Sequence, residues 1–250
     1  MKKFLSTILL FLSFLNAKTI TAEYKVSFGI FGKIGTAKAL FKINKDKTYH
    51  ILISAKATGF AKVLSGGRVE SYESSGKVID GVLVPDIYKG TTKTDTKFSQ
   101  KIYYFLHKKK VIEMLKIRQR DGKTTKSEER LKYYAKNDIL SLFFNIKHYL
   151  NGFKFVGKKV LYAVGANKKD GRVDLIVPSG KELKKLKSEL NEKSGHFMIV
   201  FINKKIFASK RGELFLDIND KGIATKAVLK DVIFFGDIRG KLKKLKITDE

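Results

Sequence analysis

The chain has 250 residues, a length that fits one large mainly β or α+β domain, or two small ones. Hydrophobic residues make up 43% of it, with 19 Phe and 10 Tyr, which is enough for a packed core and excludes general disorder. The 52 Lys and Arg residues against 24 Asp and Glu give a net charge of +28. Cysteine is absent, which excludes disulfide bonds, zinc–thiolate sites, cysteine nucleophiles and lipidation of an N-terminal cysteine.

The first residues have the three-part layout of a secretory signal peptide. A basic start at 1–3 precedes an apolar run at 4–15, and Ala17 supplies a small residue for cleavage. The run is shorter than the ~20 apolar residues of a membrane-spanning helix, and no later stretch approaches that length. We therefore expect residues 1–17 to be a signal peptide that directs the protein to the periplasm of a Gram-negative bacterium. An uncleaved N-terminal anchor is the alternative; after cleavage, no transmembrane helix is expected.

Apolar and polar residues alternate in the first part of the mature chain. Residues 23–30, 36–43 and 49–57 each place apolar side chains on one face and mostly polar ones on the other, a pattern typical of half-buried antiparallel strands. Turns are predicted at Gly32-Lys33 and at 44–47. Further strands are predicted at 68–74, 82–89, 98–106, 111–118, 197–202, 212–218, 223–230 and 238–247.

The period changes to that of a helix in the middle of the chain. Residues 138–150 carry one apolar stripe, with Asn137 or Asp138 as the N-cap and Asn151-Gly152 as the stop signal.

A second helix is predicted to begin at Ser179. Glu182 follows it at capping-box spacing, and a thin apolar seam runs through Leu183, Leu186 and Leu190. The predicted fold is therefore mainly β with a minor α+β character: an antiparallel meander curled into a barrel or half-barrel with one or two helices. No repeat or linker divides the chain, so residues 18–250 are expected to form a single β-barrel-like domain.

The motifs that resemble catalytic or metal sites fail on their spacing. The glycines of 29–35 lack the dinucleotide spacing, Ser65 has Val63 where a nucleophile elbow needs Gly, and 217–228 lacks calcium ligands. We therefore predict no catalytic residues, no metal site, no cofactor and no enzymatic activity. The four histidines are scattered: His50, His107, His148 and His196.

The basic excess has two interpretations. One is an anionic partner, such as lipid head groups or another polyanion. The other is a genome that favours lysine codons, because lysine supplies nearly all of the charge and suits bidentate phosphate recognition less well than arginine. Nucleic acid is not an expected partner, since the export signal separates the protein from it and no RNA-binding aromatic motif is present.

The alternating strands also suggest an apolar cavity. A barrel of about eight or more strands can enclose a small ligand. We therefore predict ligand-binding, cavity-lining roles for the inward side chains Tyr24, Val26, Phe28, Phe41, Ile51, Ile53, Leu214 and Leu216.

Five segments, at 59–72, 81–88, 138–142, 212–217 and 236–242, together resemble an exported family known as domain of unknown function 3108. The resemblance implies a periplasmic, antiparallel β-barrel-like protein without an established activity, and it brings no catalytic residues. Its characteristic loop here is Ser65, Gly66, Gly67 and Arg68, where the glycines fit a turn before a strand.

Two functions follow as hypotheses. The first is a non-enzymatic periplasmic protein that binds an apolar or amphiphilic envelope molecule, such as a lipid, in a curved sheet with lysines at its rim. The alternative is a structural or adaptor protein with a solid core that docks an envelope protein or the cell-wall polymer. An open apolar interior favours the first, and a filled interior favours the second.

Overall fold

The computed structural model describes residues 17–29, 32–167, 169–201, 212–232 and 236–249. The expected signal peptide, apart from Ala17, lies outside these described residues. No helix among them is long and apolar enough to cross a membrane.

Fifteen strands form one sheet in the order β8-β7-β6-β5-β4-β3-β2-β1-β15-β14-β13-β12-β11-β10-β9. Neighbouring strands are antiparallel except for the short pair β9 and β10. The mainly β prediction is thus confirmed. The strands are β1 (Lys18–Phe28), β2 (Gly32–Ile43), β3 (Thr48–Ala57), β4 (Val69–Ile79), β5 (Val82–Lys93), β6 (Lys97–Leu106), β7 (Val111–Arg120), β8 (Lys123–Arg130), β9 (Asn137–Asp138), β10 (Gly157–Val164), β11 (Arg172–Val177), β12 (His196–Phe201), β13 (Glu213–Ile218), β14 (Ala224–Val232) and β15 (Gly236–Asp249).

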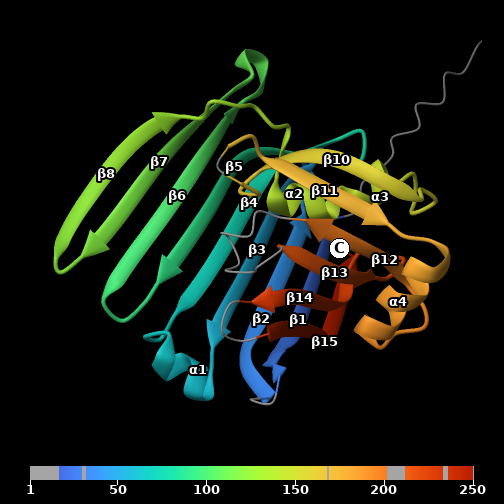
Figure 1. The fold of residues 1–250 in the computed structure, drawn as a ribbon. Coiled ribbons are helices and arrows are strands. Elements are labelled where there is room, and N and C mark those ends of the chain that lie inside the picture. The colour runs from blue at the N-terminus through green and yellow to red at the C-terminus, as the bar shows by residue number, and fades with distance from the viewer. Residues whose placement is uncertain (1–16, 30–31, 168, 202–211, 233–235, 250) are drawn as a thin grey trace, which may run out of the picture.

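The sheet is an open half-barrel. Its two ends, β8 and β9, are not paired with each other among the described residues. One arm runs outward from β1 to the long strands β6–β8, and the other curls from β15 through β14 to β10 (Figure 1). The two arms meet where β1 pairs with β15 along the whole of β1, from Lys18 opposite Asp249 to Phe28 opposite Ile238.

Short helices occupy the inside of the curve and one flank. Helix α2 (Ile139–Phe144) contacts β4 and β5 of one arm and β10 of the other, and α3 (Ile146–Tyr149) follows it. Helix α1 (Gly59–Leu64) connects β3 to β4, and α4 (Gly180–Leu190) packs on β12, β13 and β14. We call the sheet face that packs on α2 the inner face and the opposite one the outer face.

Three apolar cores hold these parts together. The largest contains Phe41, Ile51 and Ile112 from the first arm, packed with Leu140 of α2. A second core joins α2 and α3 to β10–β13, and a third places the Leu186 and Leu190 seam of α4 against Phe197 and Val228.

The N-terminus of α2 follows the prediction closely. Asp138 is its N-cap, with Oδ1 accepting hydrogen bonds from the Leu140 and Ser141 amides at 2.7 and 3.0 Å. The Ser141 hydroxyl accepts from the Asp138 amide at 3.0 Å, which completes a capping box. The expected single helix is nevertheless two helices, because the chain breaks at Asn145.

Several other predictions are wrong in detail. Helix α1 and strands β8, β9, β10 and β11 were not expected, and β4 and β5 extend beyond the predicted limits. Gly32-Lys33 begins β2 and is not the turn before it. Ser179 precedes α4 as predicted, but its side chain makes no capping hydrogen bond.

Candidate functional site

A cavity of about 890 Å³ opens at the α1 end of the sheet. Residues of β1, β2, β3, α1, β4, β14 and β15 line it, so both arms of the half-barrel contribute. Most of its surface is apolar. The apolar lining includes Val26, Phe28, Ala55, Ala57, Val232 and Ile238.

Strand periodicity and small side chains account for the cavity. Val26 and Phe28 lie on the same face of β1, two residues apart. On β3, Ala55 and Ala57 lie across β2 from Tyr24 and Val26, and their side chains fill little space. Gly35 on β2 allows the backbones to approach, because a Cβ there would lie 2.7 Å from the Lys56 carbonyl oxygen.

The loop after α1 places a cation at the edge of the cavity. Gly66 and Gly67 have φ values of 60° and 66°, which favour glycine, and the Gly67 amide donates to the Lys62 carbonyl at 2.9 Å. The Asp95 amide donates to the Gly66 carbonyl at 2.9 Å and so ties the loop to the turn between β5 and β6. Arg68 follows and lines the cavity.

Arg68 is held by an acid on the same strand face. Its Nε donates to Glu70 Oε1 at 2.8 Å, and the Tyr72 hydroxyl donates to Glu70 Oε2 at 3.2 Å. Burial, followed by the Glu70 charge, raises the pKa of Tyr72, so this hydroxyl stays a donor at neutral pH. Glu70 is the one carboxylate among the described lining residues, whereas Lys33, Lys56 and Arg68 are cations.

A second cavity, of about 190 Å³, lies deeper on the inner face. Tyr24, Phe41 and Ile53 line it together with Phe143 and Phe144 of α2. The rings of Phe41 and Phe144 stack with their centroids 4.5 Å apart. Burial raises the pKa of Tyr24 to about 12, so its hydroxyl is neutral in this apolar setting.

The predicted ligand-binding residues are divided between the two cavities and the apolar cores. Val26 and Phe28 line the large cavity, and Tyr24, Phe41 and Ile53 line the small one. Ile51 is fully buried in the first core.

The remaining predicted residues lie in the second core and in the loop. Leu214 and Leu216 pack in the second core and line neither cavity. In the predicted loop 65–68, Ser65 and Arg68 line the large cavity, while Gly66 and Gly67 form the turn of the loop. Sequence reasoning missed Glu70, although its spacing of two from both Arg68 and Tyr72 places all three on one strand face.

Three titratable residues outside the cavities have clear structural partners. Asp138 is completely buried and caps α2, His107 lies 2.7 Å from the Tyr134 hydroxyl, and His196 lies 2.8 Å from Asp220. Among the described residues, no three His, Asp or Glu side chains are grouped so as to hold a metal ion. Residues 219–222 form the predicted hairpin turn, with Gly222 at φ 79°.

No protein-family model matches the chain, and no curated protein matches it. The expected membership of domain of unknown function 3108 is therefore not confirmed. A solved structure, the crystal structure of a beta-barrel-like protein of domain of unknown function DUF1849 from Brucella abortus, aligns with 93% of this chain and 98% of its own. The TM-score is 0.47 and the sequence identity 13%, a level of similarity that assigns no function.

Proposed function

We propose that this is a non-enzymatic periplasmic protein that binds an apolar or amphiphilic envelope molecule within its curved sheet. The observation that carries the proposal is the large cavity on the inner face. Its volume of about 890 Å³ falls within the ~300–1,000 Å³ typical of small-molecule sites. Its mostly apolar lining suits an acyl chain or another apolar group.

The charge of the lining supports an amphiphile with an anionic head. Lys33 and Arg68 contribute cations to the lining, and Glu70 is the acid among the described lining residues. Lys56 also borders the cavity, but it alternates with Ala55 and Ala57 along β3, so its side chain lies on the opposite face. A head group with a phosphate or carboxylate at this edge would find an excess of positive charge, and its apolar part would lie inside.

The adaptor alternative has less support. A docking protein with a solid core needs no cavity of this size. It also has no use for an opening to which both arms of the sheet contribute. The periplasmic address and the absence of activity remain proposals. They rest on the signal-like segment 1–17 and on the role of the buried Asp138 as the N-cap of α2. The resemblance to domain of unknown function 3108 agrees with them.

Two measurements test the proposal. The first is native mass spectrometry of the protein gently purified from its own periplasm, where we expect a co-purifying lipid or similar amphiphile. The second uses the absence of tryptophan from the chain. In a Phe28→Trp variant, the single indole should be quenched by lipids with brominated acyl chains.

A matched control places the reporter outside the cavity. Phe98 pairs with Lys93 and Gln119 on the outer face of β6, so Phe98→Trp should not be quenched by bound lipid. Two results together would refute the proposed function. One is a mass spectrum without a bound ligand, and the other is quenching that is equal in both variants or absent from both.

A further inference from the structure

The outer part of the first arm has two faces of different charge. We call β6, β7 and β8 the wing. Tyr103 of β6 packs on the first core opposite Tyr88, so it marks the inner face. Two residues away along β6, Lys101 lies on the same face and is opposite Lys116 of β7.

The positive character continues along the inner face of the wing. Ser99 is opposite Arg118, the next inner position along both strands. Lys116 and Arg118 form no ion pair with any described residue. Thr125 and Ser127 of β8 lie opposite them, and the next inner position of β8, opposite Met114, is the acid Glu129.

The outer face of the wing is balanced by comparison. Glu113 lies opposite Arg130 and forms an ion pair with it at 3.8 Å. Glu128 and Lys126 occupy the next outer positions of β8. The cations of the inner face are therefore segregated on one side of the wing.

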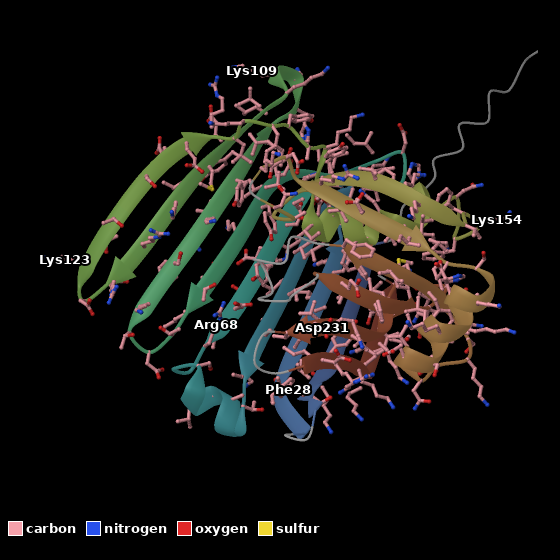
Figure 2. All side chains as sticks on the ribbon, viewed as in Figure 1. Phe28, Arg68, Lys109, Lys123, Lys154 and Asp231 are labelled. Carbon is pink, nitrogen blue, oxygen red and sulfur yellow. The ribbon has the colours of Figure 1, made fainter. Side chains whose placement is uncertain are left out.

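The inner face joins this basic surface to the large cavity. Glu70 and Tyr72 of β4 are opposite Thr92 and Gly90 of β5. Those two residues are in turn opposite Ser99 and Lys101 of β6. Between Arg68 at the cavity and the basic residues of the wing, the inner positions of β5 thus carry only small side chains. Figure 2 shows Arg68 at the base of the first arm and Lys123 at the tip of the wing.

The spacing sets the length of a ligand that reaches both places. Neighbouring strands lie about 4.8 Å apart, so β4 and β7 are separated by roughly 14 Å. A single phosphate at Arg68 is much smaller than this separation. A head group with two or more anionic groups over this distance can reach both places.

We infer that the inner face of the wing binds the extended, multiply anionic head of an amphiphile whose apolar part occupies the large cavity. This inference rests on the proposed function. The chemistry is that of a multiply phosphorylated glycolipid, and a simple phospholipid would use the cavity alone. Arginine supports it with a planar donor pair for phosphate, and lysine adds charge.

The test compares two lipids and two double variants. The lipids are a bisphosphorylated glycolipid and phosphatidylglycerol with matched acyl chains. The first variant, Lys116→Gln with Arg118→Gln, removes two inner cations. The control, Lys93→Gln with Lys126→Gln, removes the same charge from the outer face. All four side chains lie on strand surfaces, and circular dichroism checks that each variant folds.

We expect the inner-face variant to weaken glycolipid binding by about five- to twentyfold, with the loss reduced at high salt. The control, and phosphatidylglycerol with either variant, should change by less than about twofold. Equal losses in both double variants, or no loss with the inner-face variant, overturn the inference.

A tail-less bisphosphorylated disaccharide separates this inference from the proposed function. If the protein binds the disaccharide through Lys116 and Arg118 but binds neither lipid, the cavity proposal fails and the wing site stands. If both lipids quench the Phe28→Trp reporter and the inner-face variant has no effect, the wing site fails and the cavity proposal stands. Equally strong binding of an acidic polysaccharide or an acidic protein through the same two residues also overturns the glycolipid assignment.

Discussion

The Ser74 hydroxyl donates a 2.6 Å hydrogen bond to Asp138 Oδ2, which joins β4 to the N-cap of α2 across 64 positions of the chain. The Tyr49 hydroxyl lies 3.0 Å from the same serine oxygen. Burial raises the pKa of Tyr49, so its hydroxyl is neutral. These three buried side chains fix α2 on the inner face, between the two arms.

Replacing Ser74 with Ala should lower the free energy of unfolding by about 1–3 kcal/mol, because a buried carboxylate oxygen and the Tyr49 hydroxyl lose their partner. Urea unfolding measures this change. Ser75→Ala is the matched control, since Ser75 lies on the outer face opposite His50, and it should have little effect. Equal losses in the two variants would contradict the role of Ser74.

Asp138 should make stability depend on pH. Burial raises its pKa above 3.8, although its hydrogen bonds act in the opposite direction. A carboxyl with a raised pKa in the folded state stabilises the fold fully below the unfolded pKa and loses that contribution as pH rises through the folded pKa.

Asp138→Asn removes this titration and keeps an oxygen that can cap α2. The stability of the wild type relative to Asp138→Asn should therefore fall as the pH rises from about 4 towards neutrality. Urea unfolding of both proteins over that pH range gives the difference. A constant difference, or one that grows with pH, would contradict the raised pKa.

Asn145 should be important for the position of the helix pair. Its amide accepts from the Leu83 N–H at 2.8 Å and donates to the Leu83 carbonyl at 2.9 Å and to Asn137 at 3.0 Å. Asn145→Ala should cost about 2–4 kcal/mol, because buried backbone groups of β5 lose their partners. Hydrogen exchange should show faster exchange of the Leu83 amide, whereas the exposed-site variant His148→Ala should leave it unchanged.

Filling the large cavity should reduce ligand binding without unfolding the sheet. Ala55 faces the cavity, and Ser54 faces away from it on the same strand. We expect Ala55→Trp to weaken binding of a fluorescent fatty acid by about tenfold or more, because the indole occupies the apolar space. Ser54→Trp should bind normally. Loss of binding in both variants would indicate damage to the strand and not a filled cavity.

The sequence predicted most of the strands that have one apolar and one polar face. Strands β1 to β3 follow the period-two pattern, and so do the later strands that pack on the cores. The N-cap of α2 was also readable, because Asp138 precedes an apolar helical stripe. In each case the order of apolar and polar residues along the segment matches the face that the segment buries in the folded protein.

Other elements carry no such local signal. All residues of β8 are exposed, so this edge strand has no apolar face to reveal it. In β10 the usual alternation is inverted: the apolar side chains of Val160 and Tyr162 are exposed, whereas Lys159 points to the other side. Its ammonium donates to the Tyr149 carbonyl at 2.6 Å. By contrast, β11 has a readable pattern in Val173, Leu175 and Val177, and its omission was an error of interpretation.

The candidate site was predictable only in part. Val26 and Phe28 could be placed because both lie on one strand face, but their separation from Leu214 and Leu216 depends on the curl of the sheet. No sequence pattern gives that curl. The cavity also depends on the small residues of neighbouring strands, whose juxtaposition exists only after the strands pair.

The pairing of β1 with β15 has a consequence for how the chain folds. The Ser27 hydroxyl and the Arg239 carbonyl, which meet across these strands, are 212 positions apart in sequence. Within each arm the neighbouring strands are consecutive in the chain, and the connections between them are far shorter than the loop that this seam must close. We therefore expect the hairpins of the two arms to form early and their joining at the seam to be the slow kinetic step.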